Sequence, residues 1–269
     1  MDIKLKCPVC GRELSDMGKT LQCSGGHSFD RARQGYVNLL PVQFKHSLDP
    51  GDTAEMLKAR RRFLDGGSYE TICKSVLSAM KQYAPKNPRV LDIGCGEGYY
   101  TAKLRADMPG DYIGIDISKE GARMACSRDK GILFLVATAS RLPIADSQLD
   151  CVCAMFSLLL PEEYARVLKK GGCVVEVTVG SDHLRELKSI IYDEVFPQDK
   201  HPAECTELFD EALRQEYRYE LVLDNPSLRD LLMMTPHFWR IRKDKREMLE
   251  TTDSLRLTVN YWVRVLVRK

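Results

Sequence analysis

VLDIGCGEGYY, residues 90–100, carries the strongest fold signal in this 269-residue chain. The apolar residues before Gly94 are typical of a buried strand, and the pattern Gly94-x-Gly96-x-Gly98 predicts a tight turn into a helix. At such a turn the backbone can approach a ligand closely, and the first amides of the helix are free to bind it. Dinucleotide-binding folds use a similar loop, so the surrounding residues have to identify the ligand.

Two aspartates near this loop indicate the chemistry of its ligand. Asp92 stands just before the glycines, where it would repel a pyrophosphate and favour a ligand with a cationic amino group and a sulfonium. Asp116 ends the next predicted strand, where doubly wound folds place a carboxylate that accepts hydrogen bonds from ribose hydroxyls. The alternative for Asp116 is a cap for the helix that begins near Ser118.

From residue 89 onward, short runs rich in branched residues alternate with helix-like segments. The predicted strands are residues 89–94, 112–116, 132–138, 149–156 and 173–179. This alternation predicts an α/β fold with a parallel, doubly wound sheet. Residues 255–268 alternate between two faces, which indicates a half-exposed antiparallel strand. Upstream, residues 53–65 and 69–83 read as helices.

Composition limits the classes of protein that this chain can belong to. With 44% hydrophobic residues, it can form one full α/β core and a small additional module. The net charge of +2 does not by itself indicate a polyanionic partner. The start of the sequence lacks the apolar core of a signal peptide, and the longest apolar stretch, residues 151–161, is too short to span a bilayer. We therefore expect a cytoplasmic protein with reduced thiols and no membrane role.

Four residues near the N-terminus have the spacing of a zinc site. Cys7-x2-Cys10 and Cys23-x3-His27 offer three thiolates and one imidazole, a ligand set that Zn²⁺ prefers. Four protein ligands leave no open coordination position, so this zinc is expected to be structural. The alternative is a set of unrelated thiols or a disulfide. We expect residues 1–45 to form a zinc-binding module that the metal holds folded.

Several motifs of the chain resemble those of class I methyltransferases, which use S-adenosylmethionine. The matching segments are residues 91–98, 114–116, 141–143, 149–150 and 166–172. The resemblance implies a Rossmann-like, mostly parallel seven-stranded sheet with a C-terminal antiparallel strand. Many relatives hold the adenine amino group with an acidic residue, but this chain has Thr138 at that position. We expect backbone groups around Ala139 to take over this contact.

A second set of motifs resembles the RlmA or RrmA family, which methylates N1 of guanine in large-subunit ribosomal RNA. The matching positions are the four zinc-site residues, residues 29–30, 35–41, 49–52, 59–64 and 234–236, and Trp239. The resemblance implies that the zinc module and the methyltransferase domain form a cleft that holds a hairpin loop of 23S ribosomal RNA. It also implies cofactor contacts from Tyr69, the Glu97-Gly98 turn and His183.

These observations define the expected domains and site residues. We expect a zinc-binding, RNA-recognition module at residues 1–45, a helical connector at 46–84 and the methyltransferase domain at 85–269. The predicted cofactor-binding residues are Tyr69, Asp92, Gly94, Gly96, Glu97, Gly98, Asp116, Ala139 and His183. The predicted cofactors are S-adenosylmethionine and a structural Zn²⁺.

Methylation of guanine N1 makes further demands on the site. N1 carries a proton at neutral pH and must lose it before it can attack the methyl group. The sequence identifies no residue that accepts this proton. Phe156, at the end of the fourth predicted strand, either stacks on a base or belongs to the core. The basic run at residues 58–62 either contacts phosphate or forms a solvated surface.

Two other functions stay open at this point. One is a methyltransferase that acts on another RNA or on a small molecule, although a small substrate would not need the zinc module. The other is an RNA-binding protein that retains the fold without catalysis, against which the intact glycine loop and Asp116 argue. The family resemblance also suggests an effect on susceptibility to macrolide-type antibiotics. The sequence specifies neither the methylated guanine nor the choice between monomer and homodimer.

Overall fold

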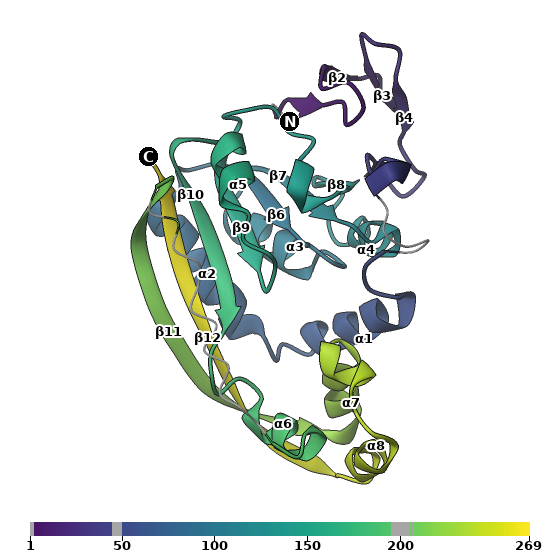
Figure 1. The fold of residues 1–269 in the computed structure, drawn as a ribbon, viewed down its shortest axis with the longest axis vertical. Coiled ribbons are helices and arrows are strands. Elements are labelled where there is room, and N and C mark those ends of the chain that lie inside the picture. Colours follow the sequence, from purple (N-terminus) through teal and green to yellow (C-terminus); the bar gives the residue numbers. More distant parts are fainter. Residues whose placement is uncertain (1–2, 45–49, 195–204, 206) are drawn as a thin grey trace.

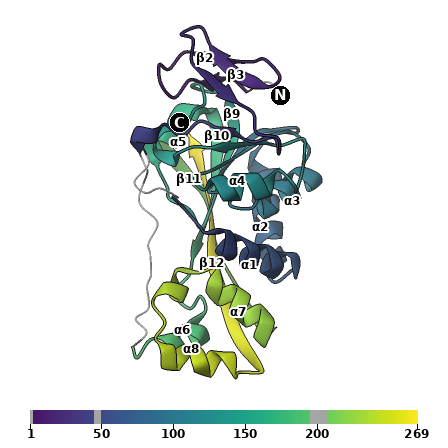
Figure 2. The same ribbon diagram turned by 90° about the vertical axis from the view of Figure 1, so that its right-hand side faces the viewer.

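The computed structural model, drawn in Figure 1, describes residues 3–44, 50–194, 205 and 207–269. Asp49 of the motif at residues 49–52, and the predicted domain boundary after residue 45, lie outside these ranges. A small sheet formed within residues 5–30 and the helices of residues 185–191, 225–233 and 243–250 lie at opposite ends of the molecule, with a large sheet between them (Figure 2).

The large sheet contains eight strands in the described residues. These are β5 (Val37–Asn38), β6 (Arg89–Ile93), β7 (Asp111–Asp116), β8 (Leu133–Val136), β9 (Leu149–Met155), β10 (Leu168–Val179), β11 (Phe209–Asp224) and β12 (Ser254–Arg268). Their order is β11-β12-β10-β9-β6-β7-β8-β5. The strands from β5 to β10 are parallel to one another, and β12 runs antiparallel to both β10 and β11. The predicted α/β class and its C-terminal antiparallel strand are confirmed.

β5 is an eighth strand that the sequence did not reveal. Val37 and Asn38 pair in parallel with Leu135 and Val136 of β8 at the edge of the large sheet. The N–H of Leu39 continues this pairing by donating to the carbonyl of Val136 at 2.9 Å. A two-residue strand has no periodicity of its own, so only its position beside β8 defines it.

Helices cover both faces of the large sheet. They are α1 (Ala54–Asp65), α2 (Glu70–Tyr83), α3 (Tyr99–Asp107), α4 (Lys119–Ala125), α5 (Pro161–Val167), α6 (Arg185–Ile191), α7 (Asn225–Met233) and α8 (Lys243–Glu250), with short 3-10 turns η1 (Val42–Phe44), η2 (Ala139–Arg141) and η3 (Pro236–Trp239). α1 and α2 begin one residue after the predicted positions, and the Thr53 side chain caps α1 by accepting the N–H of Met56. No helix in the described ranges combines the length and the apolar character needed to cross a bilayer.

The two faces of the sheet belong to two apolar clusters. One cluster contains α2 and α3, with Ile72 and Leu104 fully buried. The other contains α5, through Tyr164 and Val167, and also the N-terminal sheet. The zinc module therefore packs against the same face of the large sheet as α5.

The N-terminal sheet is antiparallel and attached to the body by its first strand. Its strands are β1 (Leu5–Lys6), β2 (Glu13–Asp16), β3 (Thr20–Cys23) and β4 (Ser28–Asp30), in that order. Leu14 and Leu21 join the cluster of the α5 face. The N–H of Lys6 donates to the carbonyl of Pro143 at 3.0 Å, which fixes the contact.

Candidate active site and metal centre

A cavity of about 570 Å³ lies at the carboxyl ends of β6, β9 and β10. Its wall includes Asp92 and Gly94 from the end of β6, Phe156 directly after β9 and Val179 at the end of β10. Residues from α1 and η3 also contribute to the wall. Open α/β sheets bind their ligands at this edge, and the volume lies within the usual range of about 300–1,000 Å³ for ligand pockets.

The glycines of residues 94–98 give the turn its shape. Gly94, Gly96 and Gly98 have φ angles of 68°, 53° and 83°, in the left-handed region that favours glycine. A Cβ on Gly98 would lie 2.8 Å from the Cβ of Ala125, and one on Gly94 would lie 3.0 Å from the Oγ of Ser157. Side chains are therefore excluded here, so the backbone itself forms the wall of the cavity.

Asp92 offers an acceptor that no described residue uses. Its side chain is 2% exposed, and its Oδ2 accepts a hydrogen bond from the Thr101 hydroxyl at 2.5 Å. Its Oδ1 is buried and has no hydrogen-bond partner among the described residues. Burial raises the pKa of Asp92 to about 7, and the charge of Asp116 adds to this effect, whereas the Thr101 hydrogen bond opposes it. A cationic ligand would satisfy the free oxygen, so the site fits the amino group or sulfonium predicted for the ligand.

Asp116 contacts the glycine turn and is not one of the wall residues of this cavity in the described part of the chain. One carboxylate oxygen accepts the N–H of Gly96 at 2.8 Å, and the other accepts the N–H of Ser118 at 2.7 Å. Burial raises its pKa, while these two backbone hydrogen bonds lower it. The cap of α4 is Ser118, whose side chain accepts the N–H of Gly121, so the alternative of Asp116 as the helix cap is wrong.

Glu97 anchors the turn to α1 through a buried carboxylate. Its Oε2 accepts hydrogen bonds from Arg61 at 2.8 Å and from two nitrogens of Arg128 at 2.6 and 2.8 Å. Its Oε1 is buried without a hydrogen-bond partner among the described residues. Two guanidinium groups compensate the buried charge, which would otherwise be costly. Glu97 therefore holds the glycine turn in place.

Tyr69 and His183 form the buried side of the cavity. Their ring centroids are 6.3 Å apart, and Phe63 packs edge-on against Tyr69 at 5.0 Å. The N–H of Asn260 donates to Nδ1 of His183 at 3.3 Å. Burial, together with the charge of Lys188, lowers the pKa of His183 to about 4. His183 is therefore neutral at pH 7, with its proton on Nε2.

The structure brings only part of the predicted cofactor set into the cavity wall. Five predicted residues line it: Tyr69, Asp92, Gly94, Glu97 and His183. Gly96 and Gly98 belong to the same turn, Asp116 accepts a hydrogen bond from that turn, and Ala139 begins η2, which follows β8 in the chain. None of these four residues is in the wall of this cavity in the described part of the chain.

Several wall residues were not identified from the sequence. Asp52 and Arg60 form an ion pair at 2.6 Å, and Arg60 also donates to the carbonyl of Met234 at 3.4 Å. The three arginines of the basic run do not present free charges, because Arg61 pairs with Glu97 and Arg62 with Asp230 in addition to the Arg60 pair. Because acidic partners are so common in sequences, no local pattern distinguishes a paired arginine from a free one.

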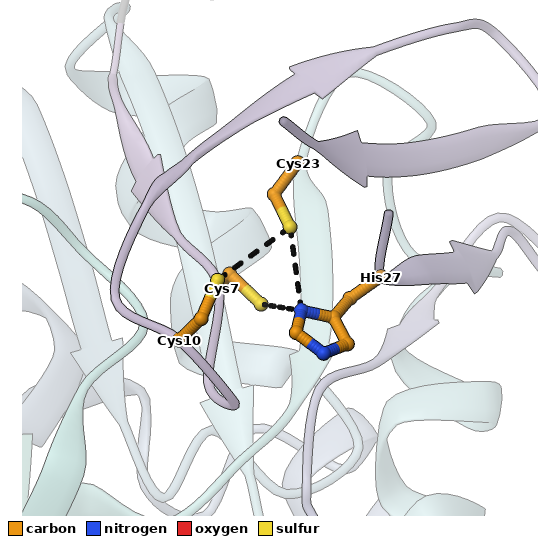
Figure 3. A group of neighbouring side chains, drawn as sticks. All are labelled: Cys7, Cys10, Cys23 and His27. Atoms are coloured by element: carbon orange, nitrogen blue, oxygen red, sulfur yellow. Dashed lines mark hydrogen bonds between the residues drawn. The ribbon is translucent and has the colours of Figure 1, made fainter. Parts of the chain in front are cut away.

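The metal centre is formed by the four predicted residues (Figure 3). The ligand atoms of Cys7, Cys10, Cys23 and His27 all lie within 4.8 Å of one another. Nδ1 of His27 is 3.6 Å from Sγ of Cys7 and 3.5 Å from Sγ of Cys23. Sγ of Cys10 is 3.6 Å from Sγ of Cys23. A tetrahedron with Zn–S bonds of about 2.3 Å has S–S edges of about 3.8 Å, so the cluster fits Zn²⁺.

Comparison with known proteins identifies the family. Residues 5–48 match a zinc-ribbon model described as RlmA, N-terminal, and residues 90–172 match a methyltransferase domain. A Bacillus subtilis protein provisionally named 23S rRNA (guanine-N(1)-)-methyltransferase YxjB is 32% identical over 273 residues, covering 95% of this chain and 94% of that protein. The chain belongs to the RlmA family. As a member of the RlmA family it is a methyltransferase, with S-adenosylmethionine as methyl donor and a structural zinc in its N-terminal ribbon.

A second relative agrees with the RlmA assignment, and a solved structure shares the fold. The 23S rRNA (guanine(748)-N(1))-methyltransferase of Streptomyces fradiae is 29% identical, over 90% of this chain and 88% of that protein. A chain from the complex between the Haloferax volcanii Trm112 methyltransferase activator and a candidate methyltransferase superposes with a TM-score of 0.52. It is 21% identical and covers 81% of this chain and 98% of that chain. This likeness supports the methyltransferase fold.

Proposed function

We propose that this RlmA-family enzyme transfers the methyl group of S-adenosylmethionine to N1 of a guanine in a hairpin loop of 23S ribosomal RNA. Relatives named for this reaction align with nearly the whole chain, including the zinc ribbon. The observation that carries the proposal is the buried Oδ1 of Asp92, which has no hydrogen-bond partner among the described residues and lies in the wall of a cavity beside a glycine turn. An unpaired buried carboxylate oxygen is costly unless a ligand satisfies it.

The proposed cofactor site uses the residues of the cavity and of the turn that supports it. S-adenosylmethionine supplies an electrophilic methyl group on a sulfonium. Tyr69, Asp92, Gly94, Glu97 and His183 would surround its methionine end, since all five line the cavity. Gly96, Gly98 and Asp116 would bind the ribose side, and the backbone around Ala139 the adenine. Neutral His183 can donate a hydrogen bond from Nε2 without adding a positive charge beside the sulfonium.

The zinc centre serves the RNA. We propose that Cys7, Cys10, Cys23 and His27 bind the ion, and that residues 1–45 recognise the RNA hairpin. Residues 46–84 would connect this module to the methyltransferase domain at residues 85–269. Because ribosomal RNA is the substrate, the enzyme would act in the cytoplasm.

Transfer of a labelled methyl group tests the function directly. Large-subunit ribosomal RNA from a strain that lacks the enzyme is incubated with the purified protein and labelled S-adenosylmethionine, and the nucleosides are then separated. We expect the label in 1-methylguanosine. Protein that binds the cofactor by calorimetry but leaves this RNA unlabelled would instead act on another RNA or on a small molecule.

Methylation at a drug-binding region of the ribosome would also alter drug sensitivity. We propose that deletion of the gene changes the inhibitory concentration of macrolide-type antibiotics. An unchanged inhibitory concentration, in a strain whose ribosomal RNA has lost the methyl group, would contradict this part of the proposal.

A further inference from the structure

Two aromatic side chains stand exposed in the wall of the cavity. Phe156 is 40% exposed and Trp239 is 68% exposed. They are the two aromatic residues among the large hydrophobic side chains that are exposed in the described part of the chain, and both line this one cavity. Single exposed apolar residues are common on protein surfaces and need no explanation. Two exposed aromatic side chains that line the same cavity are better explained by a ligand.

Phe156 stands next to the proposed position of the methyl donor. It directly follows β9, the strand beside β6, and its neighbour Ser157 approaches Gly94 so closely that a Cβ there would be 3.0 Å from its Oγ. The N–H of Phe156 donates to the carbonyl of Val177 at 2.9 Å. Its φ of 54° is in the left-handed region, which is strained for an aromatic residue. Strain of this kind is kept where a side chain has to point in a required direction.

Trp239 comes from η3, a segment much later in the chain than Phe156, and the neighbouring Phe238 supports its ring. It ends η3, and its ring packs edge-on against Phe238 at 5.1 Å. Phe238 packs against the main core, and the guanidinium of Arg246 lies over its ring at 4.7 Å. The indole ring is therefore exposed while its contact with Phe238 holds it in place, as expected for a preformed contact surface.

The chemistry of N1 methylation requires a contact of this type. The lone pair with which deprotonated N1 attacks lies in the plane of the guanine ring, so the edge of the base has to face the methyl group. The groups that orient the base must then contact its two faces rather than its reacting edge. Aromatic rings do this for an extruded base, and stacking leaves the Watson–Crick edge free.

We propose that Phe156 and Trp239 form an aromatic clamp that stacks on the extruded guanine and holds its N1 edge toward the methyl donor. The clamp rests on the proposed function and specifies how its substrate is held. In the reaction the N1–H bond breaks, the N1–CH₃ bond forms and the S–CH₃ bond breaks, with the proton released to water. Both residues are positioning residues that touch the substrate and take no proton.

Matched aromatic and aliphatic variants test the clamp. Phe156→Leu and Trp239→Leu keep an apolar side chain but remove the aromatic face, whereas Phe156→Tyr and Trp239→Phe keep that face. We expect each Leu variant to lower kcat/KM for ribosomal RNA about 10- to 100-fold, the range of a lost base–aromatic stack. The aromatic variants should stay close to the wild type. Met248→Ala, at an exposed site on α8 outside the cavity wall, is the control.

Two further readouts separate stacking from a general structural role. The dissociation constant of S-adenosylmethionine, measured by calorimetry, should not change in any of these variants. In a Trp262→Phe background Trp239 is the remaining tryptophan, and its fluorescence should be quenched when the RNA hairpin binds. The clamp would be overturned if the Leu variants kept full activity or if the aromatic variants were as defective as the Leu variants. It would also be overturned if cofactor binding weakened or if the fluorescence of Trp239 were not quenched. Wild-type protein that leaves the RNA unlabelled would overturn the proposed function as well, whereas labelled RNA with fully active Leu variants overturns the clamp alone.

Discussion

The zinc ribbon and the methyltransferase body are stabilised in different ways. In residues 3–30 the buried side chains are Ile3, Leu5, Cys7, Leu14, Leu21 and Cys23. Two of these six, Cys7 and Cys23, belong to the Cys3His cluster, so this cluster forms a large part of the interior of the ribbon. The body instead buries a continuous apolar core on each face of an eight-stranded sheet in the described residues. A module this small has too little apolar surface to fold without a cross-link, whereas the body does not need one.

Removal of a zinc ligand should give the largest effect and affect one region only. We expect Cys23→Ser to release the metal and unfold the ribbon, because binding of the metal supplies most of its folding free energy. Methyl transfer to 23S ribosomal RNA should fall to background, while binding of S-adenosylmethionine persists. Zinc content, calorimetry and the labelling assay measure the three quantities. Ser24→Ala, at an exposed neighbouring position, is the control. Loss of cofactor binding in Cys23→Ser would show that the two regions fold as one unit.

Equivalent leucines in the two regions sharpen the contrast. Leu91 in β6 is fully buried, and Leu91→Ala should lower the free energy of unfolding of the whole body by about 2–5 kcal/mol. Leu21 in β3 is also buried and lies at the ribbon end of the same apolar cluster, so Leu21→Ala should mainly weaken zinc binding and shift the urea midpoint of the body less than Leu91→Ala does. Urea denaturation and competition with a zinc chelator measure the two effects. Equal shifts of the urea midpoint would mean that the ribbon and the body unfold as one cooperative unit.

In the methyltransferase body, the buried carboxylate of Asp92 should contribute to the binding of S-adenosylmethionine. We expect Asp92→Asn to weaken S-adenosylmethionine binding at pH 8 by about 10- to 100-fold, the value of a charge-assisted hydrogen bond. Since burial raises the pKa of Asp92 to about 7, ionising it costs folding free energy as the pH rises toward and through 7. A cationic ligand favours the ionised form, so the affinity of the wild type should increase from pH 6 to pH 8. Calorimetry of both proteins across this range tests the expectation, and an identical pH dependence in Asp92→Asn would contradict it.

The smallest expected effect is at the start of the connector. Thr53→Ala removes the side chain that caps α1, which should cost about 1 kcal/mol in the free energy of unfolding. Thr53→Ser keeps a hydroxyl and should preserve the cap. Urea denaturation of both variants measures the difference. Equal stability of the Ala and Ser variants would mean that α1 is held by its ion pairs to Glu97 and Asp230 rather than by its cap.

Local sequence patterns predicted those helices and strands whose apolar residues recur at a regular spacing or that contain a known motif. The alternating residues 255–268 became β12, and the helical spacings at 53–65 and 69–83 became α1 and α2. β11 was missed, although Tyr217, Tyr219 and Leu221 alternate there, because charged residues separate them and the opposite face is exposed. Phe156 shows the limit for a single residue, since the core interpretation of its position was wrong and the side chain stands in the cavity wall.

The sequence alone determined the fold class, the four residues of the metal cluster and the glycine turn with Asp92 and Asp116. Each of these depends on spacings of a few residues, which local geometry converts directly into structure. Only the tertiary structure decided which residues meet across the cavity. Arg60 of α1 reaches the carbonyl of Met234, and Trp239 lines the same wall as Phe156 and Asp92. Such contacts depend on how β6, β9, α1 and η3 pack against one another, and no local pattern encodes that packing.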